Sequence, residues 1–137
     1  MEEYVEDGTL RIEWHDFPYL GQESLTAAVA ARAAQDQGKF WEYHDLLYRN
    51  QSGGYPLEKL LGLAGEAGLD VETFESDLAD PDRYTEIVAD DFREGQQRGI
   101  SGTPTFVING RVIAGLQPLE VYEEAIAEAK SEAEGGS

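Results

Sequence analysis

The chain has 137 residues and a formal net charge of -18, with 28 acidic and 10 basic side chains and no cysteine. This length suits one domain that buries about two-thirds of the surface its unfolded chain exposes. The lack of cysteine excludes disulfides, cysteine-ligated metal sites and cysteine nucleophiles within the chain. The negative charge repels phosphate backbones and anionic membranes, so we expect no nucleic-acid binding and no binding to a membrane surface.

The acidic residues are spread along the whole sequence, and the only lysines are Lys39, Lys59 and Lys130. This pattern favours a solvated surface adapted to high salt over a dedicated site for cations or a basic partner. Molar salt shortens the Debye length to ~3 Å and so suppresses self-repulsion of such a chain. We therefore expect an acidic protein from a halophile.

Neither a membrane span nor a leader is evident. The longest stretch of small residues, 25–34, contains Arg32 and is shorter than the ~18–20 apolar residues that a span requires. Residues 1–7 are acidic where a signal peptide would be basic and then apolar. The sequence as given predicts a cytoplasmic location, with export only if a leader has been removed.

A short strand followed by several helices is expected in the first two-thirds of the chain. Apolar and polar residues alternate over 10–14, which is the period of a strand. Apolar spacing, glycine stops and capping residues then predict helices. The predicted helices cover 24–38, 39–48, 56–68, 70–79 and 80–99, with Asp70 and Asp80 as caps and Pro81 in the first turn of the last one. The helix over 39–48 has apolar residues on more than one face, so we expect it at the buried centre.

A β-hairpin is the clearest local prediction. Two apolar runs, 105–108 and 111–114, flank Asn109-Gly110, which is a preferred type I′ turn. This turn pairs Ile108 with Arg111, Val107 with Val112, Phe106 with Ile113 and Thr105 with Ala114. Both faces of the hairpin are then largely apolar, so helices should cover both sides. A final amphipathic helix should begin at Pro118.

Common catalytic and metal-binding patterns are absent. His15 and His44 are the only histidines, and neither lies in a His-Glu-x-x-His pattern. Ser101 lacks the second glycine of a Gly-x-Ser-x-Gly elbow. We expect no metal ion and no cofactor. His44 could act as a general base with Asp45 beside it. Adjacent residues of a helix do not face each other, however, which favours a structural role for this histidine. By local rules alone, Pro104 is a trans proline at the start of a strand.

Four motifs occur in order: Asp16-Phe-Pro18, Gly38-Lys-Phe-Trp-Glu-Tyr-His-Asp-Leu-Leu-Tyr48, Gly99-Ile-Ser-Gly-Thr-Pro-Thr-Phe-Val-Ile-Asn-Gly110 and Gly115-Leu-Gln-Pro-Leu119. Together they resemble the DsbA-like family of thiol-disulfide oxidoreductases, from about Tyr4 to Lys130. The resemblance implies an α/β, thioredoxin-like fold with an all-helical insertion. It also implies that Pro104 is a cis-proline and that Gly102, Thr103 and Pro104 bind an extended peptide by β-strand addition.

The chain departs from this family at its N-terminus. Members begin with a strand and a helix that opens on Cys-x-x-Cys, whose first thiolate is the nucleophile. Here residues 4–7 resemble the end of that helix, and residues 10–14 resemble the second strand. Thiol-disulfide exchange requires a thiolate, so the chain as given should be redox-inactive, with no catalytic residue present. The missing strand would leave strand edges unpaired, so we expect either that the chain is a fragment of a complete oxidoreductase or that a second copy or a partner segment completes the sheet.

Three functions remain open. The first is a DsbA-like oxidoreductase whose catalytic segment is missing. The second is a cysteine-free module that binds peptides or proteins in the cis-proline groove. The third is a glutathione-using isomerase or transferase of the same superfamily. The resemblance assigns residues 1–23 and 99–131 to the thioredoxin-like part, 24–98 to the helical insertion and 132–137 to a flexible tail.

Overall fold

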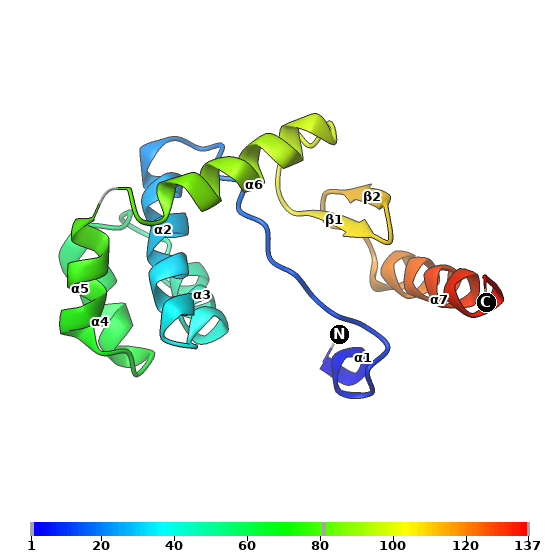
Figure 1. The fold of residues 1–137 in the computed structure, drawn as a ribbon, viewed down its shortest axis with the longest axis horizontal. Coiled ribbons are helices and arrows are strands. Elements are labelled where there is room, and N and C mark those ends of the chain that lie inside the picture. Colours follow the sequence, from blue (N-terminus) through cyan, green and yellow to red (C-terminus); the bar gives the residue numbers. More distant parts are fainter. Residues whose placement is uncertain (1, 81, 137) are drawn as a thin grey trace. The chain divides into compact units, whose positions relative to one another are not determined.

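The structure is a computed structural model that describes residues 2–80 and 82–136. Its elements, labelled in Figure 1, are α1 (Glu2–Glu6), α2 (Gln22–Asp36), α3 (Phe40–Arg49), α4 (Leu57–Glu66), α5 (Val71–Ala79), α6 (Thr85–Gln97), β1 (Thr105–Ile108), β2 (Arg111–Ala114) and α7 (Leu119–Gly135). The chain divides into two compact units. One comprises residues 16–94, and the other comprises the residues up to 15 together with those from 95 onward.

The unit of residues 16–94 is helical, and α2 packs against both α3 and α5 (Figure 1). Three alanines of α2, Ala30, Ala33 and Ala34, are completely buried, so short side chains allow neighbouring helices to approach closely. Tyr43 of α3 and Phe74 of α5 are equally buried, and their ring centroids lie 5.2 Å apart. The core of this unit is therefore built from small residues on α2 and aromatic residues on the helices around it.

The buried phenols of this core are hydrogen-bonded. The Tyr43 hydroxyl donates to the Leu60 carbonyl oxygen at 3.1 Å, and the Tyr84 hydroxyl donates to an Asp36 carboxylate oxygen at 2.8 Å. Burial raises the pKa of both phenols. Arg83 bridges Asp36 and the buried Asp77, at 3.2 and 2.8 Å. Both phenols thus remain protonated donors, and α2 and α5 are joined through a shared arginine.

The capping predictions differ in outcome. Asp70 caps α5 as expected, because its carboxylate accepts from the Thr73 backbone N–H at 2.8 Å, and these bonds lower the Asp70 pKa. The prediction for Asp80 was wrong, since its carboxylate accepts from the Asp82 N–H at 3.1 Å and so stabilises a turn. The next helix, α6, begins only at Thr85. Pro81 lies outside the described residues.

The other unit contains the hairpin and α7. The predicted register is confirmed in full, from Thr105 opposite Ala114 to Ile108 opposite Arg111. Asn109 and Gly110 have φ values of 46° and 91°, as a type I′ turn requires. Phe106 and Ile113 pack on Tyr122 and Ala125 of α7, the helix that follows the hairpin in the same unit (Figure 1). The helix runs to Gly135, so residues 132–135 of the expected tail are helical.

Three expectations for exposure and pairing were wrong. Helices do not cover both hairpin faces in the described unit, because Val107 and Val112 are 40% and 45% exposed. Residues 10–14 form no strand; in the described part of the chain no other strand lies beside them to satisfy their backbone groups. Trp41 and Tyr48 are 46% and 56% exposed, so α3 buries one face and is not enclosed.

No helix among the described residues combines the length and the apolar character needed to cross a membrane.

Candidate functional site

The segment between α6 and β1 carries the predicted binding residues. After α6 ends at Gln97, the Ile100 N–H donates to the Gly95 carbonyl at 3.0 Å, and Gly99 adopts a φ of 75°. This left-handed glycine redirects the chain out of the helix. Thr103 and Pro104 are exposed, Gly102 is partly buried, and the peptide bond between Thr103 and Pro104 is cis.

Short hydrogen bonds fix the shape of this segment. The Thr105 hydroxyl donates to the Gly102 carbonyl oxygen at 2.8 Å. The Pro104 carbonyl oxygen accepts from the Gly115 N–H, also at 2.8 Å. Thr103 itself makes no hydrogen bond with another described residue. Its backbone N–H and carbonyl oxygen are therefore available at the surface.

Tyr122 of helix α7 bonds to Gly115 and Gln117, the residues that follow β2. The Tyr122 hydroxyl donates to the Gly115 carbonyl at 3.2 Å and accepts from the Gln117 N–H at 2.9 Å. Gly115 in turn bonds to Pro104, so the conformation of residues 102–104 is coupled to α7.

Among the described residues, no strand lies beside the outer edge of β1. In an antiparallel pair, alternate residue pairs exchange backbone hydrogen bonds. Pro104 and Gly115 are a bonded pair, so Phe106 and Ile108 point their backbone groups toward β2. Thr105 and Val107 consequently direct their N–H and carbonyl groups away from β2. In the described residues the sheet consists of β1 and β2 alone, so nothing in this sheet pairs with these groups.

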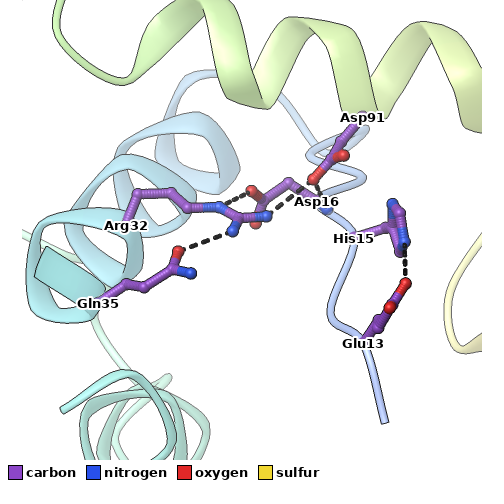
Figure 2. A network of polar contacts seen from close by, with 6 residues as sticks. All are labelled: Glu13, His15, Asp16, Arg32, Gln35 and Asp91. Atoms are coloured by element: carbon purple, nitrogen blue, oxygen red, sulfur yellow. Dashed lines mark hydrogen bonds and ion pairs between the residues drawn. The ribbon is translucent and has the colours of Figure 1, made fainter. Parts of the chain in front are cut away.

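A second polar cluster lies in the helical unit, around Arg32 of α2 (Figure 2). Its guanidinium donates to Asp16 at 2.6 Å, to Asp91 at 2.8 Å and to Gln35 at 2.8 Å. The Asp91 carboxylate also accepts from the Asp16 backbone N–H at 2.9 Å. The Arg32 and Asp16 side chains are only 11% and 2% exposed. The cluster joins the first residues of this unit to α2 and to α6.

The Arg32 cluster is held together by ion pairs. Its one guanidinium faces the carboxylates of Asp16 and Asp91, so it fixes the two segments of chain that carry them. The sequence contained a signal for it, because Arg32 is the single charged residue within the alanine-rich stretch 27–34. Its partners Asp16 and Asp91 are 75 residues apart, and no sequence pattern joins them.

The His44–Asp45 pair differs from the expectation. The Nδ1 atom of His44 lies 3.1 Å from a carboxylate oxygen of Asp45, so these neighbouring residues do interact. The i, i+1 argument failed because the Asp45 side chain turns back toward the ring. The ring also lies 4.7 Å from that of Tyr48 and 5.3 Å from that of Trp41, measured between centroids. An aromatic setting of this kind is consistent with a structural histidine.

A family model, a curated relative and a solved structure all relate the chain to thioredoxin-like proteins. A family model described as thioredoxin matches residues 1–128. The chain is 31% identical to a probable disulfide bond formation protein D of Bacillus cereus, over 81% of this chain and 55% of that protein. A crystal structure of a thioredoxin-like oxidoreductase from Silicibacter pomeroyi superposes with a TM-score of 0.74 and 32% identity, covering 85% of this chain and 66% of the other.

A membrane transporter is also among the relatives. The chain is 38% identical to a Na⁺/H⁺ antiporter NhaA 1 of Salinispora arenicola over 94% of its own length. It spans only 20% of that antiporter and about half of the Bacillus protein.

Proposed function

The chain belongs to the thioredoxin family and is similar to its DsbA-like members, and from this premise we propose that it binds extended peptide segments along β1. The site comprises the exposed backbone of Gly102, Thr103 and Pro104 and the outward backbone groups of Thr105 and Val107. The peptide adds to β1 as a further strand.

One observation carries this proposal. Among the described residues no strand pairs with the outer edge of β1, and this edge continues into the exposed backbone of Thr103. Alternating donors and acceptors along an edge of this kind match the backbone of any extended peptide, whatever its sequence. The 102–104 segment is held in shape by Gly115 and Tyr122, so little ordering is required on binding.

The chain contributes no redox group of its own. Thiol-disulfide exchange proceeds by attack of a thiolate on a disulfide sulfur, and the chain contains no cysteine. The relatives named for disulfide chemistry support a role with substrate proteins. In this chain that role is binding, and a thiolate from another chain or segment would be needed for exchange.

Peptide binding is tested by proline substitutions on the two strands. Thr105→Pro removes an N–H on the outer edge of β1 and also the hydroxyl that bonds to the Gly102 carbonyl, and it leaves the bonds to β2 in place. We expect it to weaken binding of a blocked peptide of alternating valine and threonine about tenfold, measured by calorimetry at low protein concentration. Ala114→Pro, on the residue opposite Thr105, removes an N–H on the outer edge of β2 and should bind as the wild type does. Equal affinity in both variants would contradict the proposal.

A second candidate function rests on the antiporter relative, whose likeness covers nearly the whole chain. The chain would then act as a binding domain alongside a membrane transporter. Sequencing the complete reading frame separates the candidates. An in-frame Cys-x-x-Cys supports the oxidoreductase, whereas in-frame transmembrane helices support the transporter.

We also propose that the acidic surface adapts the chain to high salt. Repulsion among its excess carboxylates opposes folding in dilute buffer and is screened in molar KCl. We expect the melting temperature to rise by ~5 °C or more between these conditions, measured by circular dichroism. A melting temperature that stays constant or falls would count against salt adaptation.

A further inference from the structure

A groove runs beside α2 within the helical unit. A cavity of about 440 Å³ lies between the start of α2 and α6, and a second cavity of about 280 Å³ lies between α2, α4 and the end of α5. Gln22, Leu25 and Thr85 line both cavities, so the two adjoin. All lining residues belong to the unit of residues 16–94. We call this feature the α2 groove.

The walls of the α2 groove are largely apolar. Leu25 and Val29 lie one turn apart on α2, and Val88 and Phe92 lie one turn apart on α6. Leu57 of α4 also lines the groove and is 52% exposed, so its apolar surface is open to a ligand. Rows of side chains spaced four residues apart accept the side chains of another helix between them. The groove therefore suits the apolar face of an amphipathic helix.

Carboxylates stand beside the α2 groove. Glu23, Glu58 and Glu86 each follow a lining residue directly in the sequence, and all three are exposed. The Glu23 carboxylate lies against Gly54, next to Tyr55 of the groove wall. In the described part of the chain, no basic side chain pairs with any of these three carboxylates. An apolar surface thus has uncompensated negative charge beside it.

Basic side chains near the α2 groove are bound to other groups. Those nearest to lining residues in the sequence are Lys59, Arg83 and Arg93. Lys59 donates to two backbone carbonyls of the loop between α3 and α4, at 2.9 Å each. Arg83 and Arg93 pair with aspartates. We propose that the α2 groove binds a basic amphipathic helix of a partner protein.

Charge favours this occupant over two others. A second copy of the chain has the same net charge of -18 and is repelled, as is an anionic membrane. A basic amphipathic helix instead places apolar side chains in the groove and lysine or arginine beside the three carboxylates, which gives specificity. Salt should weaken this binding without abolishing it, because salt screens the exposed ion pairs while the apolar contacts persist. The binding does not depend on the proposed peptide site at β1.

Three labelled peptides test the chemistry of the occupant. The first consists of leucine and lysine, with leucine recurring every three or four residues so that a helix has one apolar face. The second has the same composition in scrambled order, and the third has glutamate in place of lysine. By fluorescence anisotropy with the full chain, we expect the first to bind at least about tenfold more tightly than either of the others. Equal binding of the scrambled peptide would show general attraction to an acidic chain and overturn the proposal, as would equal binding of the acidic peptide.

Two lysine substitutions on α6 test the location. Ala89 lines the α2 groove, whereas Ile87 is 49% exposed and is not among the lining residues. Ala89→Lys and Ile87→Lys add the same charge to the same helix. We expect Ala89→Lys to weaken binding of the first peptide about tenfold and Ile87→Lys to leave it within about twofold, with circular dichroism confirming that both variants fold. Equal affinities in the two variants would place the peptide elsewhere and overturn the proposal.

Two further measurements address the other occupants. Sedimentation of the full chain alone should show no dimer that Ala89→Lys dissociates, since such a dimer would place a second copy in the groove. The product of the complete reading frame should bind the first peptide as well. Failure to bind there would indicate a groove already filled by the same chain and would overturn the proposal. Ala89→Lys should leave binding of the valine-threonine peptide unchanged, so this proposal and the proposed function can fail separately.

Discussion

Replacement of Arg32 by alanine should lower the free energy of unfolding by about 3–5 kcal/mol. The substitution leaves Asp16 and Asp91 facing each other without their cation, and Asp16 is buried with a side chain only 2% exposed. An uncompensated buried charge is among the most costly changes a core can undergo. Urea denaturation followed by circular dichroism measures the loss.

Arg93→Ala is the matched control for Arg32→Ala. Arg93 also pairs with an aspartate of α6, Asp90, but both side chains are more than half exposed. Surface pairs of this kind contribute ~0–1 kcal/mol. A similar loss of stability in both variants would show that the Arg32 cluster is no stronger than a surface ion pair.

Replacement of Phe74 by alanine should destabilise the helical unit by about 3–5 kcal/mol. The Phe74 ring is completely buried, and it packs against Tyr43 across the α3–α5 contact. Truncation removes the apolar area and leaves a cavity beside side chains that are held by their own hydrogen bonds, such as that of Tyr43 to Leu60. The measurement is the shift of the urea midpoint at an unchanged slope.

Phe74→Leu keeps most of the buried volume and should cost less than ~1.5 kcal/mol. Trp41→Ala removes a larger ring from a position that is 46% exposed, so its cost should also be small. A larger loss in the free energy of unfolding for Trp41→Ala than for Phe74→Ala would contradict a core formed between α2, α3 and α5.

Local signals in the sequence were sufficient for elements whose determinants are close together. Asn109-Gly110 specified the turn, and the turn specified the register of every pair in the hairpin. Asp70 likewise capped α5 through a residue three positions away. The thioredoxin-like fold followed from the motifs and agrees with the matched family model.

Predictions failed where the outcome depends on distant partners. Residues 10–14 have the alternation of a strand, but alternation describes only side chains, and a strand also needs a neighbour for its backbone. The Asp80 carboxylate bonded to the N–H of Asp82, and the helix that it was expected to cap begins only at Thr85. The Arg32 cluster joins Asp16 to Asp91, so only the folded helical unit reveals it.

The candidate binding residues were identified from the motif, and the structure adds the edge beside them. Gly102, Thr103 and Pro104 could be named because the motif over residues 99–110 resembles that of the DsbA-like family. Thr105 and Val107 could not be named from the sequence. Strand periodicity shows which side chains share a face, but it does not show which backbone groups lack a neighbouring strand. That information came from the bond between Gly115 and Pro104.

The most direct test of peptide binding at β1 is a nuclear magnetic resonance titration of the isotope-labelled chain with the blocked valine-threonine peptide. We predict that the amide signals of Thr103, Thr105 and Val107 shift together and saturate, while those of Val112 and Ala114 on the other edge stay in place. Saturating shifts confined to β2 or to the helical unit, or no shift at all, would contradict the account.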